Sequence, residues 1–221
     1  MPRSSASSRP GKRAAPRPYH HGDLRAALLD AAAGRLDEQG EQALTLRELA
    51  RAAGVSHAAP YHHFANREEL LAGVAERAFD RLADALAAVA GAPEAAQALL
   101  DIGEAYVREA LAHPAQFRLM FGPLLARKAG HPGLQRAAER AFLVLLEAAR
   151  RYAPERGLEI ALAGWSLSHG AANLAIDGAF AGLPLAPAQA RQRARLDAGA
   201  LVRRMVAGLL QLPVPTKRRR R

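Results

Sequence analysis

The chain has 221 residues, half of them hydrophobic, and carries a formal net charge of +10 at pH 7. It contains no cysteine, which excludes disulfides and cysteine-ligated metals. Alanine and leucine dominate while aromatic and β-branched residues are sparse, so the composition predicts an all-α fold. We find neither a long apolar run nor the apolar core of a signal peptide, and we therefore expect a cytoplasmic protein without a membrane partner.

The positive charge is concentrated at the two ends of the chain. Residues 1–22 and residues 217–221 each hold five basic side chains and no acidic one, whereas the remainder is neutral. We expect residues 1–18 to form a disordered basic arm and residues 213–221 a basic tail. Basic tails attract polyanions by counterion release, although charge runs are often merely solvated.

The first predicted helix spans residues 23–39. Its apolar residues recur at helical spacing, and Gly40 directly follows the last of them. The stripe consists of Leu24, Leu28, Ala31, Ala32 and Leu36.

A helix-turn-helix is predicted between residues 45 and 64. Thr45 and Glu48 are spaced as a capping box that begins one helix, and Gly54 is placed to end it in a left-handed conformation. Ser56 is a good N-cap for a second short helix bearing polar and aromatic side chains. The alternative is an ordinary helical hairpin.

The segment GVSHAAPYHHFANREEL (54–70), preceded by Thr45 and Leu49-Ala50, resembles the TetR family of bacterial one-component transcription regulators. The resemblance covers about residues 20–80. It implies an N-terminal three-helix DNA-binding domain followed by an all-helical ligand-binding and dimerisation domain. This sequence departs from the family pattern at Pro60, which disfavours α conformation at Ala59. The recognition helix is therefore expected to start late or with a tight first turn.

Ten residues of this region are interpreted as DNA-binding. Tyr61 is expected at a phosphate rather than in the core, because a short recognition helix has little inward face. Arg67 is expected at a phosphate because a cation in the first turn of a helix is unfavourable to the helix dipole, which hints at an external anion; simple solvation of Arg67 is the alternative. His57, Ala58 and His62 are expected nearer base edges. The full set is Thr45, Arg47, Ser56, His57, Ala58, Ala59, Tyr61, His62, His63 and Arg67.

The histidines of this region do not predict a metal site. Adjacent histidines on a helix diverge by about 100°, unlike the i, i+4 pair that binds zinc. No metal and no cofactor is expected.

The remaining chain is predicted to be helical. Asn66 and Glu69 form a second capping pattern, which opens a long helix to about residue 89. Later helices are expected at 99–111, 116–127 (with a break at Gly122-Pro123), 134–152, 155–182 and 187–211. The DNA-binding domain is assigned to residues 19–66, extending to about 81, and the C-terminal domain to residues 82–212.

The helix at 155–182 has two distinct stripes. One is apolar and includes Leu158, Leu162, Trp165, His169, Ala172, Ile176 and Phe180; the other is small and includes Gly164, Ser168, Ala171, Ala175 and Gly182. Residues 165–170 (WSLSHG) resemble a TetR subgroup named for a Trp-His-Gly signature. The family resemblance implies a homodimer through the last two helices. An apolar face for such pairing is supplied by Leu201, Val202, Met205, Val206 and Leu209.

A cavity for an apolar small molecule is predicted between the helix of Tyr106, the segment 117–121 and the helix of Trp165. The proposed ligand-binding residues are Tyr106, Phe117, Phe121, Trp165, His169 and Asn173. Alternatively, Trp165 and His169 only pack in the core. No catalytic residue is assigned, because Ser166, His169 and Asp177 on one straight helix cannot relay protons.

These features together predict a homodimeric repressor that binds a near-palindromic operator in double-stranded DNA and is released by a small-molecule effector. The alternatives are a ligand-independent DNA-binding protein or activator of the same fold, and an enzyme with a helical apolar pocket.

Overall fold

The computed structural model describes residues 21–122, 130–180 and 197–211. All regular elements in these ranges are helices, which confirms the predicted all-α class. The α-helices are α1 (His21–Gln39), α2 (Leu46–Ala52), α3 (Arg67–Ala90), α4 (Ala95–Ala112), α5 (Pro114–Phe121), α6 (Pro132–Tyr152), α7 (Gly157–Ile176) and α9 (Ala198–Leu209). Three short 3-10 helices are η1 (Glu41–Ala43), η2 (Ala59–His62) and η5 (Pro154–Arg156). None of the helices described is long and apolar enough to cross a membrane.

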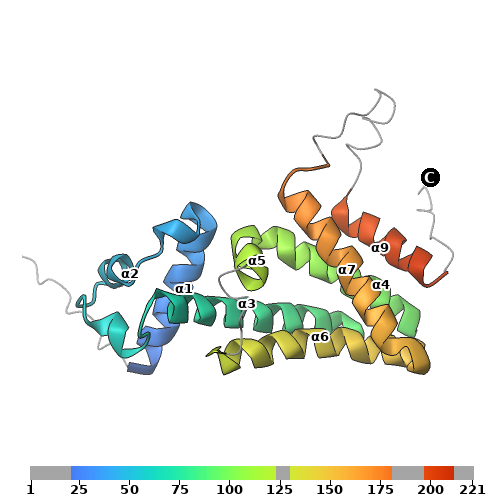
Figure 1. The fold of residues 1–221 in the computed structure, drawn as a ribbon, viewed down its shortest axis with the longest axis horizontal. Coiled ribbons are helices and arrows are strands. Elements are labelled where there is room, and N and C mark those ends of the chain that lie inside the picture. The colour runs from blue at the N-terminus through green and yellow to red at the C-terminus, as the bar shows by residue number, and fades with distance from the viewer. Residues whose placement is uncertain (1–20, 123–129, 181–196, 212–221) are drawn as a thin grey trace, which may run out of the picture.

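The head of the molecule, residues 21–66, lies at the left of Figure 1 and is formed by α1, η1, α2 and η2. Its core contains the predicted stripe of α1 together with Leu49 and Phe64, which are almost completely buried. The predicted cap of α2 is confirmed, because the Glu48 N–H donates to the Thr45 hydroxyl at 3.2 Å. In turn, the Thr45 hydroxyl donates to the Glu48 carboxylate at 2.9 Å. Local sequence therefore determines where α2 begins.

Gly54 ends α2 as predicted. Its φ of 67° lies in the left-handed region, where glycine has no steric penalty. The Val55 N–H donates to the Ala50 carbonyl at 3.0 Å and the Gly54 N–H to the Arg51 carbonyl at 3.2 Å, which is the Schellman pattern. The turn thus returns the chain toward the head core, against which Val55 packs.

The second helix of the predicted pair is shorter and tighter than expected from Ser56. After turns at residues 57 and 58, only the 3-10 helix η2 forms, and no side chain caps it, so the expected N-cap role of Ser56 is wrong. Pro60 explains the difference: it lacks an N–H and disfavours α conformation at Ala59. The Ala59 N–H instead reaches the Ser56 carbonyl at 3.1 Å, and buried Pro60 packs inward.

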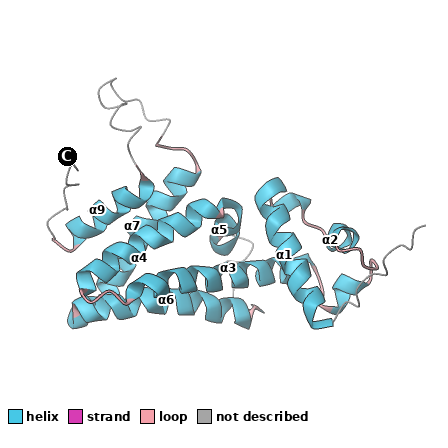
Figure 2. Ribbon diagram, turned by 180° about the vertical axis from the view of Figure 1, so that it is seen from behind, coloured by secondary structure: helices cyan, strands magenta, loops and turns pink. Residues whose placement is uncertain are grey.

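The long helix α3 leaves the head and runs through the body, which consists of α3–α7 and α9. Its N-terminus is capped as predicted, with the Glu69 N–H donating to the Asn66 side chain at 2.9 Å. The Glu69 carboxylate accepts from the Ala65 N–H at 2.7 Å, which completes the box one residue earlier than in the usual pattern. Figures 1 and 2 show α6 lying alongside α3, with α4, α7 and α9 above them.

Helix α7 ends near Ile176 rather than at residue 182. Gly178, with φ of 66°, ends it by the same Schellman pattern as in α2: the Ala179 N–H donates to the Leu174 carbonyl at 2.9 Å. The predicted helical parts at 123–127, 181–182 and 187–196 lie outside the described residues, as do the two basic tails.

The apolar stripe of α7 is only partly buried, whereas most of the small stripe is buried. Leu158 and Leu162 are 56% and 44% exposed, whereas the small residues Gly164, Ser168 and Ala171 are buried. The small stripe packs inside the subunit, where α4 and α9 approach closely. A side chain at Gly103 of α4 would lie 2.9 Å from Val202 of α9 and 3.4 Å from the Ser168 hydroxyl. Small residues thus serve intramolecular contact in this helix.

Candidate DNA-binding surface and ligand cavity

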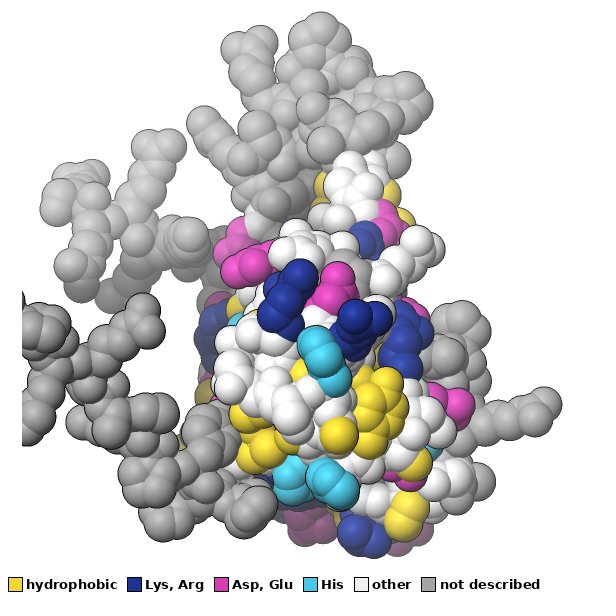
Figure 3. Space-filling view, turned by 90° about the vertical axis from the view of Figure 1, so that its left-hand side faces the viewer, with side chains coloured by type: hydrophobic (Ala, Val, Ile, Leu, Met, Phe, Trp, Pro, Cys, Tyr) yellow, Lys and Arg dark blue, Asp and Glu magenta, His cyan; other side chains and the backbone are white. Residues whose placement is uncertain are grey.

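The outer end of the head presents basic, histidine and hydrophobic side chains to solvent. Figure 3 shows this end, with arginine, histidine and hydrophobic groups side by side. Seven of the ten residues interpreted as DNA-binding are exposed, namely Thr45, Arg47, Ser56, His57, Ala58, Tyr61 and His62. Tyr61 is 56% exposed, as expected for a side chain outside the core. Ala59 and His63 are half-buried.

Arg67 has partners within the chain. Its guanidinium donates to the Leu44 carbonyl at 2.9 Å and to the Glu41 carbonyl at 2.5 Å. It also forms a 3.3 Å ion pair with the Glu41 carboxylate. The position of Arg67 in the first turn of α3 is therefore explained by these acceptors, which connect α3 to the η1 segment. An external phosphate is thus not required to explain this position, and the expected phosphate contact of Arg67 stays a prediction.

The histidines of the head form no metal-binding cluster within the described residues. No group of three His, Cys, Asp or Glu side chains suited to holding a metal ion occurs among the described residues. His57 and His62 instead face solvent on the head surface.

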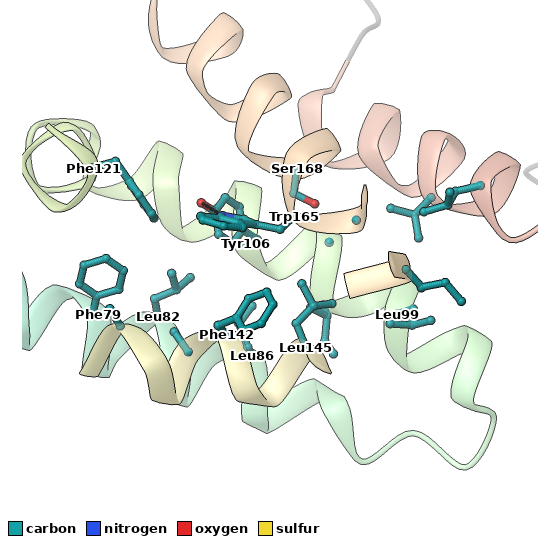
Figure 4. A pocket seen from close by; sticks show the side chains of 18 residues that line it. Phe79, Leu82, Leu86, Leu99, Tyr106, Phe121, Phe142, Leu145, Trp165 and Ser168 are labelled. Atoms are coloured by element: carbon teal, nitrogen blue, oxygen red, sulfur yellow. Dashed lines mark hydrogen bonds between the residues drawn. The ribbon is translucent and has the colours of Figure 1, made fainter. Parts of the chain in front are cut away.

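A cavity of about 150 Å³ lies in the body between α3, α4, α6, α7 and α9, with Phe121 of α5 at one end (Figure 4). Aliphatic and aromatic side chains form nearly all of its wall. The lining residues are Phe79, Leu82, Leu86, Leu99, Ile102, Gly103, Tyr106, Phe121, Ala138, Ala141, Phe142, Leu145, Ile160, Gly164, Trp165, Ser168, Val206 and Leu209.

Three of the six residues predicted to bind a ligand line this cavity: Tyr106, Phe121 and Trp165. The other three do not. Phe117 and His169 pack behind Phe121, with ring centroids 5.1 Å and 4.6 Å from it, and Asn173 donates to the backbone carbonyl of His169. The shared face of Trp165 and His169 is therefore divided: Trp165 lines the cavity, whereas His169 packs against Phe117 and Phe121.

Trp165, Tyr106 and His169 form a hydrogen-bonded series beside the cavity. The indole N–H of Trp165 can only donate, so the Tyr106 oxygen accepts from it at 3.3 Å. The same hydroxyl forms a second hydrogen bond, of 2.9 Å, with Nδ1 of His169. Burial lowers the pKa of His169 below its ordinary value and raises that of Tyr106, so both groups are held neutral.

Much of the cavity wall was not assigned to a ligand site from the sequence. Phe79 and Leu82 of α3 and Phe142 and Leu145 of α6 were expected only as core residues. Their helical spacing indicates burial but does not distinguish a packed core from a cavity wall. The T-shaped contact of Phe142 with Trp165, at 5.9 Å between ring centroids, shows how α6 completes the site.

A polar network joins the head to the body beside the cavity. The amide of Gln116 in α5 donates to the Asp37 carboxylate of α1 at 2.6 Å and accepts from Arg81 of α3 at 2.9 Å. Arg81 also pairs with Glu109 of α4 at 2.8 Å, and Nδ1 of His113 lies 3.4 Å from Asp37. Gln116 is only 3% exposed. This junction network, absent from the sequence interpretation, therefore links α1, α3, α4 and α5.

Comparison with known families matches both parts of the chain. The Tetracyclin repressor-like C-terminal domain matches residues 99–209, half of the chain, and the tetR family of bacterial regulatory proteins matches residues 28–74. A curated relative, the HTH-type transcriptional regulator BetI of Rhizobium meliloti, is 42% identical over 60 residues, 27% of this chain and 30% of BetI. The HTH-type transcriptional repressor KstR2 of Mycobacterium tuberculosis is 38% identical over 79 residues, 34% of this chain and 40% of KstR2.

Solved structures match over a greater length. A Rhodococcus protein of unknown function is 30% identical, with a TM-score of 0.74 over 89% of this chain and 98% of that one. The TetR family regulator PfmR from Thermus thermophilus is 24% identical, with a TM-score of 0.58 over 84% and 97% of the two chains, and shows the same fold. Both parts of the chain and its overall architecture agree, and the chain belongs to the TetR family of bacterial transcription regulators.

Proposed function

We propose that this DNA-binding transcription regulator is a repressor released from a near-palindromic operator by a small molecule that enters the apolar cavity. One observation carries the proposal: the short helix α5 contacts both the cavity and the head. Phe121 at its C-terminal end lines the cavity, and Gln116, five residues earlier, bonds to Asp37 in the head. The membership of the chain in a family of regulators rather than enzymes supports this role over that of an enzyme.

The DNA contacts in this proposal lie on the exposed end of the head. Arg47, Arg51 and Tyr61 are exposed and suited to phosphates, while His57 and His62 can reach base edges. Because η2 is a single 3-10 turn, few side chains can enter the major groove together. We therefore expect each half-site to be short. The basic tails would add affinity that depends on salt rather than on sequence.

A homodimer, typical of the family, would present two heads to the two halves of an operator. On α7, Leu158, Leu162 and Leu174 remain 56%, 44% and 49% exposed, and they lie along one i, i+4 ridge with Gly170. Such ridges are the units by which helices pack, and glycine permits close approach at the crossing. We propose that this ridge pairs with its copy, in place of the small stripe that is already buried within the subunit.

The coupling between the sites would run through α5. A molecule in the cavity would press on Phe121, whose ring contacts Phe79 of α3 at 5.3 Å between centroids. Displacing α5 would alter the hydrogen bond between Gln116 and Asp37, and hence the position of α1. A ligand that binds one arrangement of this junction more tightly would shift the spacing of the two heads.

The more specific resemblance of residues 165–170 to the Trp-His-Gly subgroup stays a prediction. Trp165 and His169 hold Tyr106 between them through hydrogen bonds of 3.3 Å and 2.9 Å. A structural role for the two signature side chains is therefore available in this chain whether or not it belongs to that subgroup.

The decisive experiment recovers the DNA that the purified full chain selects from the sheared genome of its own organism. We expect enrichment of near-palindromic sites whose half-sites are about one helical turn apart, roughly 34–36 Å. Apolar fractions of an extract from the same cells should then release the protein from these DNA sites. Enrichment that no fraction reverses would favour the ligand-independent alternative, and the absence of any enriched site would overturn the proposal.

A further inference from the structure

We propose that the cavity selects an uncharged, mostly apolar molecule bearing one hydroxyl or carbonyl group, and that the Ser168 hydroxyl binds that group. The inference rests on the proposed function in taking the cavity as the effector site. It goes further by naming the chemical class of the effector and the residue that recognises its polar atom.

The first step is the absence of charge in the wall. Among the described residues that line the cavity, none is Asp, Glu, Lys, Arg or His. A carboxylate, phosphate or ammonium group inside it would lose its hydration without gaining an ionic partner, which is strongly unfavourable. The wall therefore discriminates against charged molecules and favours neutral ones.

The second step is the unusual state of the Ser168 side chain. The residue is 3% exposed and lines the cavity from α7 (Figure 4), yet its hydroxyl has no hydrogen-bond partner among the described residues. Ser166, two residues earlier on the same helix, donates to the Leu162 carbonyl at 2.8 Å, the usual arrangement for a helical serine. No fully enclosed side-chain oxygen or nitrogen in the described part lacks a partner, so the Ser168 oxygen retains access to the cavity.

The third step is that Tyr106, the other hydroxyl in the wall, already has two side-chain partners. Its oxygen accepts from the indole N–H of Trp165 at 3.3 Å and shares a 2.9 Å hydrogen bond with Nδ1 of His169. Ser168 is therefore the wall hydroxyl left for a ligand. Ser168 can both donate and accept, so it is suited to either a carbonyl or a hydroxyl group.

The size of the cavity limits the molecule. A cavity of roughly 150 Å³ lined by Leu, Ile and Phe binds benzene in another protein, and the volume here is about 150 Å³. The expected occupant is a six-membered ring or a chain of similar volume, with its polar atom at Ser168.

The test uses the full chain and three ring probes: cyclohexanol, methylcyclohexane and cyclohexanecarboxylate. Trp165 is the only tryptophan in the sequence and lines the cavity, so its fluorescence reports occupancy without any DNA. We expect both neutral rings to bind and the carboxylate to have no effect at concentrations that saturate with cyclohexanol. Replacing Ser168 with Ala should lower the affinity for cyclohexanol, relative to that for methylcyclohexane, by about two- to tenfold, which corresponds to one net hydrogen bond.

Ser166→Ala is the matched control, because it removes a hydroxyl from the same helix that is exposed and bonded to the backbone. It should leave the ratio of the two affinities unchanged. Ser168→Cys provides a second variant, with a slightly larger side chain and a weaker donor, and we expect an intermediate ratio. Melting temperatures of all variants establish that the fold is retained.

The inference is overturned if Ser168→Ala and Ser166→Ala have the same effect, if the carboxylate binds as tightly as cyclohexanol, or if neither neutral ring alters the fluorescence. Because no DNA is present, these results are separate from the release assay. A chain that binds neutral rings through Ser168 yet is never released from DNA would contradict the proposed repressor function and leave this inference standing.

Discussion

The side-chain amide of Gln116 donates a 2.6 Å hydrogen bond to the carboxylate of Asp37, which joins α5 of the body to the end of α1 in the head. Both residues belong to the junction network that also includes Arg81. The bond is largely shielded from solvent, since Gln116 is buried. Because it joins the helix that borders the cavity to the head, this bond is well suited to a test of coupling between ligand binding and DNA binding.

Replacing Gln116 with Ala should weaken communication between the two sites. The variant leaves the Asp37 and Arg81 groups without their shared partner, which we expect to lower the free energy of unfolding by about 1–3 kcal/mol. It should still bind cyclohexanol, but the ligand concentration needed for release from DNA should change. Thermal unfolding and DNA-release titrations measure the two effects. Gln97→Ala, which removes a 2.7 Å bond to Asp101 within α4, is the matched control; an equal change in release would contradict the role of the junction.

Arg67 and Arg51 should respond differently to truncation. Arg67→Ala removes hydrogen bonds to the Leu44 and Glu41 carbonyls, so we expect a loss of about 1–3 kcal/mol in unfolding free energy. Arg51 is exposed, and Arg51→Ala should change stability by less than about 0.5 kcal/mol. It should instead lower the salt slope of DNA binding by about one, uniformly over sequences. Calorimetric unfolding and binding at several salt concentrations separate the effects, and a fully stable Arg67→Ala protein would refute the structural role.

Leu162→Asp should produce monomers that remain folded. Leu162 is exposed on the α7 ridge, so a charge there disrupts pairing with a second copy without entering the subunit core. Asp at Ala171 or Val206 is expected to act differently: both are buried within the subunit, and a buried unpaired charge lowers stability by about 3–5 kcal/mol. Sedimentation and circular dichroism distinguish the two outcomes. Leu111→Asp, at an exposed leucine of α4, is the control, and an unchanged dimer mass for Leu162→Asp would move the interface elsewhere.

Because of His169, the free energy of unfolding of the native chain should fall in acid. Burial lowers the pKa of His169 from its ordinary 6.5, so below that pH the unfolded chain binds a proton that the folded chain does not. Stability therefore falls as the pH drops from 6.5 to the lowered pKa of the folded state and levels off below it.

The measurement compares melting temperatures of the native chain and His169→Phe from about pH 7.5 to about pH 5. We expect the melting temperature of the native chain, relative to that of His169→Phe, to fall as the pH is lowered over this range, because the variant has no group that takes up a proton at that position. Tyr106→Phe keeps the histidine but removes its hydroxyl partner and serves as the control. An advantage that stays constant or grows in acid would contradict the neutral, buried state of His169.

The sequence by itself determined the features that depend on neighbouring residues. Thr45 and Asn66 each accept from a backbone N–H three residues later, and Gly54 takes the left-handed conformation that ends α2. The penalty of Pro60 for α conformation is equally local, and η2 is the tight turn that this penalty produces. These are interactions over one helical turn, so the starts of α2 and α3, the end of α2 and the resemblance to the family could be predicted from short segments.

Only the tertiary structure decided which face of each helix meets which partner. From the sequence alone, either the apolar or the small stripe of α7 could face the subunit core. The close approach of α4 at Gly103 buries the small stripe. The acceptors of Arg67 lie more than 20 residues away, and the hydrogen-bond partners of Gln116 more than 30. The unpaired hydroxyl of Ser168 exists because α4, α7 and α9 converge around it without filling the space. Such features depend on the relative placement of distant helices, which is set by the packing of the whole core rather than by spacing within one segment.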